Sequence, residues 1–266
     1  MSVRMLLDWI GEPRLAGVDV DSVDLVYLHR DILRSKPMIY GVMGEFYRTC
    51  RSLDQQHLSG DGLRIEIGAG SSLMKDFQPD VQVTDLKPAA FLDRVLDAEQ
   101  MDLPDGSVHA VYGINCFHHL PGPDRFFSEL ERVLVPGGGC VLIEPYFGPF
   151  AAFLYRRLFT TERFDPDEES WEGSSSQGAM TGANQALSYI IFQRDAAEFQ
   201  RKHPRLTLAH QQRLHNYLRY LSSGGLNFRQ LLPNVATAVL RGVERALTPF
   251  DHLLALHHAI VIRKTE

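Results

Sequence analysis

The chain has 266 residues, enough to bury one large hydrophobic core or two small ones. Its hydrophobic share of 44%, charged share of 23% and net charge of −6 are ordinary for a globular protein and disfavour nucleic acid as the main partner. The three cysteines (Cys50, Cys116 and Cys140) lie far apart, without a disulfide framework or metal-ligand spacing, so we expect a reducing cytoplasm and no metal ion. Residues 1–10 carry charge too early for a signal peptide, and no apolar run approaches the ~18–20 residues that span a bilayer.

Two helices are predicted ahead of residue 60. Apolar residues recur at helical spacing over 24–35, and Pro37 interrupts this pattern. A second helix is expected over about 38–53, before a turn formed by S-G-D-G at 59–62. Residues 1–60 are therefore interpreted as an N-terminal helical cap.

Residues 62–145 alternate strand and helix signals. Five short apolar runs predict strands at Leu63–Ile67, Val81–Thr84, Val95–Leu96, His109–Asn115 and Cys140–Glu144. A helix is expected over Phe126–Leu134, ended by P-G-G-G at 136–139. Buried parallel strands are typically such short apolar runs, so the fold class predicted is α/β with a doubly wound, mostly parallel sheet.

Residues 146–256 break this alternation. They contain aromatic clusters, an acidic run and two predicted helices, at about 186–202 and 227–248, before a last strand at His258–Arg263. The expected organisation is a cofactor-binding core at 61–145, a largely helical substrate-binding or lid insertion at 146–256, and a final core strand at 257–266.

Polar or small residues follow the predicted strands, where open α/β sheets bind their ligands. Gly68 and Gly70 allow a tight turn whose backbone N–H groups can approach a ligand. Asp85 ends the second strand, where a carboxylate can accept both hydroxyls of a ribose. Asp97 ends the third strand, where a carboxylate can accept the adenine amino group, and Asn115 ends the fourth. This layout predicts a site for a cofactor that contains a nucleoside.

A set of sequence blocks gives this site a family resemblance. The blocks are E-I-G-A-G-S-S, V-T-D-L, V-L-D-A-E-Q-M-D-L-P-D-G-S, N-C-F-H-H-L-P-G-P-D-R-F-F-S-E-L-E-R-V-L-V-P-G-G-G and V-L-I-E-P. In order and spacing they resemble class I S-adenosylmethionine-dependent methyltransferases, especially the branch with the ubiquinone and menaquinone biosynthesis enzymes, over about residues 60–145. The resemblance implies a seven-stranded Rossmann-like sheet, S-adenosylmethionine as cofactor and S-adenosylhomocysteine as product.

The resemblance also implies which residues contact the cofactor. The methionine part maps to Glu66, Gly68, Ala69 and Gly70, the ribose to Asp85, the adenine to Leu86, Asp97 and Ala98, and the methionine and transferred methyl group to Asn115.

Three residues are candidates for catalysis. His118 or His119 could remove a proton from an attacking hydroxyl, although H-H-L-P also resembles a family feature found where no base is required. Tyr146 follows the fifth strand and, like Glu144 at that strand's end, is expected near the same crevice. Either of these two could orient or deprotonate a substrate, and packing or solvent roles stay open for both.

The insertion is expected to select a small or partly hydrophobic acceptor, such as a natural product, a quinone-like ring or a lipid-linked sugar. This expectation rests on its apolar residues Phe147, Phe150, Phe153, Leu154, Tyr155 and Leu158. O-methylation is favoured on general frequency. The segments 173–182 and 210–215 are interpreted either as a lid with a substrate pocket or as exposed loops. Residues 148–159 are interpreted either as a peripheral membrane contact or, with more support, as a helix packed on the core.

Two other classes of function stay open. The first is a catalytically silent binding protein with a methyltransferase fold, which would have no need of Gly68, Gly70, Asp85 and Asp97. The second is an NAD-dependent oxidoreductase. Ser72 counts against it, because this residue stands where a dinucleotide-binding turn has its third glycine.

Overall fold

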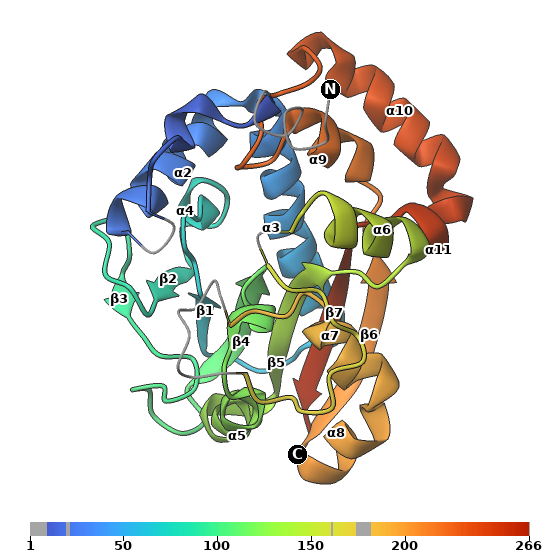
Figure 1. Ribbon diagram of the computed structural model, residues 1–266. Helices are drawn as coiled ribbons and strands as arrows, with labels where there is room; N and C mark the ends of the chain where they lie inside the picture. The colour runs from blue at the N-terminus through green and yellow to red at the C-terminus, as the bar shows by residue number, and fades with distance from the viewer. Residues whose placement is uncertain (1–9, 20–21, 161, 174–181, 266) are drawn as a thin grey trace.

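The computed structural model describes residues 10–19, 22–160, 162–173 and 182–265 (Figure 1). A seven-stranded sheet in the order β3-β2-β1-β4-β5-β7-β6 forms its centre. The strands are β1 (Leu63–Ile67), β2 (Gln82–Asp85), β3 (Arg94–Val95), β4 (Val108–Ile114), β5 (Leu134–Pro145), β6 (Leu206–Arg213) and β7 (His257–Lys264). Strands β1 to β5 pair in parallel, whereas β7 runs antiparallel to both β5 and β6. The predicted fold class, a mostly parallel Rossmann-like sheet, is confirmed.

Helices cover both faces of this sheet. They are α2 (Val23–Ser35), α3 (Pro37–His57), α4 (Met74–Phe77), α5 (Pro123–Val133), α6 (Pro149–Arg157), α7 (Leu187–Tyr189), α8 (Ala196–Lys202), α9 (Tyr217–Ser223), α10 (Thr237–Leu247) and α11 (Asp251–Leu254). A π-helical turn, Ile190–Arg194, joins α7 to α8. None of the helices in the described ranges is both long and apolar enough to cross a membrane.

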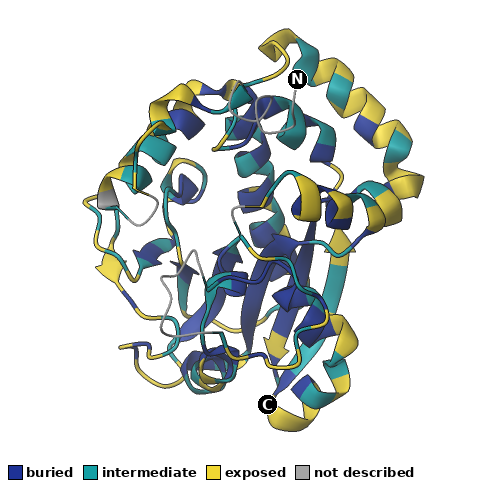
Figure 2. Ribbon diagram, in the orientation of Figure 1, coloured by how far each residue is buried: buried dark blue, intermediate teal, exposed yellow. Residues whose placement is uncertain are grey.

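The side chains of β5 show how the two faces are filled. Cys140 and Leu142 pack with α5 and the α7–α8 segment, whereas Val141 and Ile143 pack against α3. Both sets are buried because consecutive strand residues point to opposite faces and helices cover each face. Figure 2 shows the resulting contrast between the buried centre of the sheet and the largely exposed α10.

The order of the strands places the candidate ligand site. Strand β1 connects through α4 to β2 on one side, whereas β4 lies on its other side. The direction of winding therefore reverses between β1 and β4, and a crevice opens beyond their carboxyl ends. The glycine turn after β1 and Asn115 after β4 both lie at this edge.

The structure corrects three sequence predictions. The segment 210–215 is neither a lid nor an exposed loop, because residues 206–213 form β6, which pairs with β7 along the edge of the sheet. Residues 227–236 are not in an α-helix, and α10 begins only at Thr237. P-G-G-G at 136–139 does not end the preceding helix, which stops at Val133. These residues instead lie inside β5, where Gly139 pairs with both Ala110 and Arg263.

A buried carboxylate ties α3 to the sheet. Asp54 is 1% exposed and accepts hydrogen bonds from Tyr112 Oη at 2.5 Å and Arg64 Nε at 2.8 Å, with His109 Nε2 at 2.6 Å. Burial opposes its ionisation, but these three partners outweigh burial and lower the pKa of Asp54. The carboxylate of Asp54 therefore links α3 to both β1 and β4.

We expect Asp54→Ala to reduce the free energy of unfolding by about 3 kcal/mol or more, because it leaves a buried tyrosine, a buried histidine and a partly exposed arginine without their acceptor. Asp61→Ala, at an exposed position in the turn before β1, should change it by less than about 0.5 kcal/mol. Urea unfolding followed by circular dichroism measures both variants. Equal, small effects would show that Asp54 does not anchor α3.

Candidate functional site

One large cavity of about 870 Å³ opens at the carboxyl ends of β1, β2 and β4. It brings together ten of the twelve site residues named from the sequence. They are Glu66, Gly68, Ala69, Gly70, Asp85, Leu86, Ala98, Asn115, His118 and His119. The remaining two, Asp97 and Tyr146, do not line it.

The turn after β1 needs glycine at two positions. Gly68 and Gly70 have φ angles of +54° and +49°, in the left-handed region where a side chain is strained. A Cβ atom on Gly68 would also lie 2.6 Å from Cβ of Cys116. The Gly70 amide donates to Asp85 Oδ2 at 2.7 Å, so the turn is fixed to the end of β2. This contact keeps the backbone of the turn open to the cavity.

Glu66 lies beneath this turn and is 2% exposed. Its Oε2 accepts a hydrogen bond from Ser72 Oγ at 2.6 Å, and Ser72 Oγ lies 3.3 Å from Tyr47 Oη. Burial raises the pKa of Glu66 to about 8, despite the hydrogen bond from Ser72. The carboxyl group thus orders the glycine turn and is sensitive to any cation placed in the cavity.

Asn115 provides the clearest test of whether a ligand fits here. Its φ of +50° is the one positive value among the described non-glycine residues. Its Oδ1 is buried and has no hydrogen-bond partner within the described ranges. A strained backbone and an unsatisfied acceptor in a cavity wall indicate a site built for a donor supplied by a ligand. The ammonium group of S-adenosylmethionine is such a donor, and the carboxylate of Asp85 suits a ribose, so the residues present fit this cofactor.

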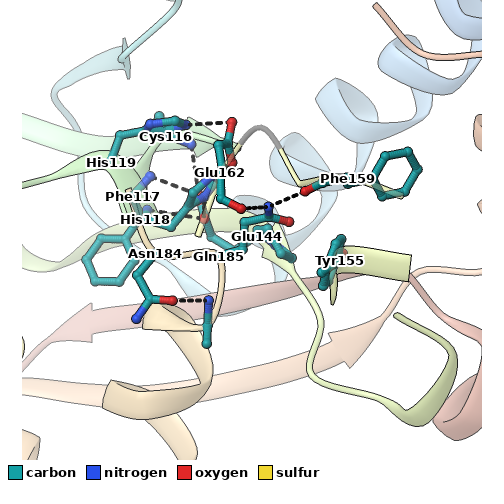
Figure 3. A network of polar contacts seen from close by, with 12 residues as sticks. Cys116, Phe117, His118, His119, Glu144, Tyr155, Phe159, Glu162, Asn184 and Gln185 are labelled. Atoms are coloured by element: carbon teal, nitrogen blue, oxygen red, sulfur yellow. Dashed lines mark hydrogen bonds and ion pairs between the residues drawn. The ribbon is translucent and has the colours of Figure 1, made fainter. Parts of the chain in front are cut away.

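His118 lies between two carboxylates (Figure 3). Its Nδ1 is 2.5 Å from Glu144 Oε2 and its Nε2 is 3.1 Å from Glu162 Oε2. Burial lowers the pKa of His118, but Glu144 and Glu162 outweigh burial and raise it to about 10. The two carboxylates therefore favour the protonated ring, and these surroundings do not support the expectation that His118 removes a proton from a substrate.

Glu144 holds the loop that follows β4. It is fully buried, and its Oε1 accepts hydrogen bonds from the backbone amides of Cys116 at 3.0 Å and Phe117 at 2.9 Å. Because these donors and His118 surround the carboxylate, Glu144 does not face the cavity. Its observed contacts therefore order the loop and leave no path to a substrate.

His119 faces the cavity beside His118. The two rings have centroids 4.2 Å apart, and His119 Nε2 lies 3.7 Å from Glu162 Oε1. Glu162 was not singled out from the sequence, because it follows the histidines by about 40 residues in the insertion and no local pattern marks it. His29 and His257 were missed as well. Both line the cavity, and His29 Nε2 and His257 Nδ1 are buried atoms without a hydrogen-bond partner in the described parts of the chain.

The two remaining site residues lie elsewhere. Tyr146 does not point into the crevice, because the chain turns toward the β7 side of the sheet after Pro145. Its hydroxyl accepts from Arg213 Nε at 3.0 Å, and its backbone amide donates to Leu256 at 2.8 Å. Asp97 is exposed and caps a turn by accepting from the Glu99 amide at 2.8 Å, while its neighbour Ala98 lines the cavity.

The cavity continues from the glycine turn into an apolar chamber. Its walls come from α2, α3, the end of α6, and α9 with the loop after it. They include Leu33, Met43, Tyr155, Leu158, Leu221 and Phe228. Residues 148–157 thus contribute to a packed wall, with Phe153 on the exposed side of α6. Gly173 and Gly182 also line the chamber. Between them, residues 174–181 of the predicted lid segment 173–182 lie outside the described residues.

Residues 69–142 match the family model described as a methyltransferase domain. This segment runs from the glycine turn into β5 and contains Asp85, Ala98, Asn115 and both candidate histidines. The match identifies a methyltransferase domain within the part of the chain where the sequence predicts the cofactor site.

Two further similarities were found. A stretch of 42 residues is 50% identical to part of the sterol 24-C-methyltransferase of Yarrowia lipolytica, covering 16% of this chain and only 11% of that protein. The crystal structure of geranyl diphosphate C-methyltransferase from Streptomyces coelicolor A3(2), in complex with Mg²⁺, geranyl diphosphate and S-adenosyl-L-homocysteine, aligns over 96% of this chain and 89% of its own. That alignment has 14% identity and a TM-score of 0.47.

Replacing Glu66 by glutamine should change how stability depends on pH. Because its folded pKa of about 8 exceeds the usual value of 4.5, Glu66 favours the fold below about pH 4.5, and this contribution is lost as the pH rises through 8. Relative to wild type, Glu66→Gln should therefore gain about 1–3 kcal/mol between about pH 5 and pH 8.5. Urea unfolding across this range measures the difference.

Glu169→Gln, at an exposed position, is the matched control and should follow the wild-type curve. Parallel curves for wild type and Glu66→Gln would show that Glu66 is ionised in the folded protein at neutral pH.

Proposed function

We propose that the chain transfers the methyl group of S-adenosylmethionine to a small, partly apolar acceptor. One observation carries this proposal: a single cavity joins the glycine turn of a methyltransferase domain to an apolar chamber. The first part offers Asp85 and the unsatisfied Asn115 Oδ1 to a polar cofactor, and the second offers mainly apolar side chains, with a few polar ones such as His29 and His257. In this proposal residues 61–145 hold the cofactor, and 146–256 together with the helices of 1–60 enclose the acceptor.

In this reaction the chain would mainly position the acceptor against the cofactor and exclude water from the site. When bound, the cofactor supplies an electrophilic methyl group on a sulfonium, so the acceptor must be aligned and water kept away. Asp85, Gly70 and Asn115 would hold the cofactor at the strand ends. Ala98 and Leu86 would flank its adenine. Asp97, in the turn that follows β3, would contact the adenine from outside the cavity lining. The apolar walls would exclude water and align the acceptor.

His119 is the better of the two histidines for accepting a proton. Both line the cavity, but both nitrogens of His118 contact carboxylates of Glu144 and Glu162, which raise its pKa to about 10. A base is needed only if the attacking atom starts protonated with a high pKa. The preference for an oxygen acceptor remains part of the proposal, as does the likeness to the ubiquinone and menaquinone branch. The three cysteines are free and buried, which supports the proposed cytoplasmic location.

Asp85→Ala should weaken the binding of S-adenosylhomocysteine by about 1–3 kcal/mol, because two hydroxyl groups lose a charged acceptor and the glycine turn loses its link to β2. Asp102→Ala, at an exposed position outside the cavity, should bind as wild type does. Isothermal titration calorimetry measures both. If well-folded wild-type protein fails to bind S-adenosylmethionine and its product, the proposed function is wrong.

A charge in the apolar chamber should separate acceptor binding from cofactor binding. Leu158→Lys should leave the affinity for S-adenosylhomocysteine unchanged but lower methyl transfer at least about tenfold, because an ammonium in this wall is costly to desolvate. Phe153→Lys, on the exposed side of α6, is the control and should retain activity. Transfer of labelled methyl groups to a panel of isoprenoid, quinone-like and glycolipid acceptors measures the effect. Equal activity of both variants would place the acceptor elsewhere.

A further inference from the structure

His118, His119 and Glu162 meet in the wall of the cavity. Each offers one nitrogen or oxygen ligand atom, and these three atoms lie within 4.8 Å of one another. All three side chains line the cavity, on the side where the core meets the insertion (Figure 3). We propose that they bind one divalent transition-metal ion, with free coordination positions turned toward the acceptor chamber.

The distances suit one shared ion. His118 Nε2 lies 3.1 Å from Glu162 Oε2, and His119 Nε2 lies 3.7 Å from Glu162 Oε1. Two ligands that each bind an ion at about 2.1 Å, with an angle of about 90–110° between them, are about 3.0–3.5 Å apart. The first separation falls in this interval and the second lies slightly above it, and each involves a different oxygen of the Glu162 carboxylate.

The surroundings hold the ligands in place. His118 Nδ1 contacts Glu144 Oε2 at 2.5 Å, and Glu144 is fully buried behind the cavity wall. Metal-binding histidines typically use their second nitrogen in this way, which fixes the ring and aims the first nitrogen at the ion. Gln185 anchors the third ligand from the other side, because its side chain donates to the carbonyl oxygens of Glu162 at 3.3 Å and Phe159 at 3.2 Å.

The charge at this place also suits a divalent ion. Glu144 and Glu162 place two carboxylates around one imidazole, with His118 only 3% exposed and Glu144 fully buried. An ion with two positive charges would balance these two carboxylates. Two imidazoles and one carboxylate favour Zn²⁺, Fe²⁺, Co²⁺ or Mn²⁺ over Mg²⁺ and Ca²⁺, which prefer oxygen ligands.

The site predicts one feature of the acceptor. Three protein ligands leave coordination positions open, and these would take an anionic oxygen of the acceptor, such as a phosphate, carboxylate or phenolate group. This last step rests on the proposed function, whereas metal binding itself does not. An acceptor with an apolar body and one such oxygen would suit both the chamber and its polar wall.

Titration of the full chain with Co²⁺, without cofactor or acceptor, tests the site. We expect one equivalent of Co²⁺ with visible d–d absorption bands, and displacement of this signal by Zn²⁺. Glu162→Gln and His119→Ala should each weaken Co²⁺ binding at least about tenfold. Glu162→Asp keeps a carboxylate and should retain weaker binding. If Glu162→Gln does not fold, His119→Ala and Glu162→Asp still decide the question.

The matched control removes a different histidine pair. His57, the last residue of α3, stacks on His210 of β6, with ring centroids 4.6 Å apart. The double variant His57→Ala/His210→Ala should keep the Co²⁺ signal. Absence of a stoichiometric signal in wild type, or its loss only in the double variant, would overturn the proposal. Binding of S-adenosylhomocysteine, measured in the same samples, reports on the proposed function separately.

Discussion

The buried carboxylate of Glu144 is the interaction on which the site depends. It lies at the end of β5 and gathers the backbone amides of two residues after β4 together with the ring of His118. These bonds fix the loop that contains Asn115 at one end and His119 at the other. Through His118 they also reach Glu162, so the same anion connects the cofactor-binding core to the insertion. An unpaired carboxylate at this depth would be costly, and this is why its partners are held so closely.

This connection assigns different tasks to residues of similar chemistry. Glu66 and Glu144 both end strands of the central sheet and both are buried. The Glu66 carboxyl group accepts a hydrogen bond from the neutral Ser72 hydroxyl, and burial raises its pKa. Glu144 is opposed by burial too, but His118 and the backbone amides lower its pKa. The protonation of Glu66 is thus sensitive to a cationic ligand, whereas the Glu144 carboxylate has a structural role.

Sequence patterns revealed the core well and the insertion poorly, for physical reasons. Strand β1 was predicted at Leu63–Ile67, where it is found, because buried parallel strands are short and apolar. Strand β6 was missed because its exposed edge carries His210, Gln211, Gln212 and Arg213, which look like a polar loop in one dimension. Most residues predicted to contact a cofactor line the cavity, because they follow strands in order. Glu162 could not, because its 44-residue separation from His118 is closed only by tertiary packing.

The pairing of β6 with β7 connects the walls of the apolar chamber directly to the central sheet. Residues 146–205 leave the sheet after β5, and the chain returns to it as β6 before leaving again and closing with β7 between β5 and β6. The segments that enclose the chamber are therefore joined to the sheet at two places, at the end of β5 and at β6 with β7. They cannot be exchanged or shortened in the way that a simple surface loop can. All the pairings between β5 and β7 join residues more than a hundred positions apart, so this part of the sheet forms only at the entropic cost of closing a long stretch of chain.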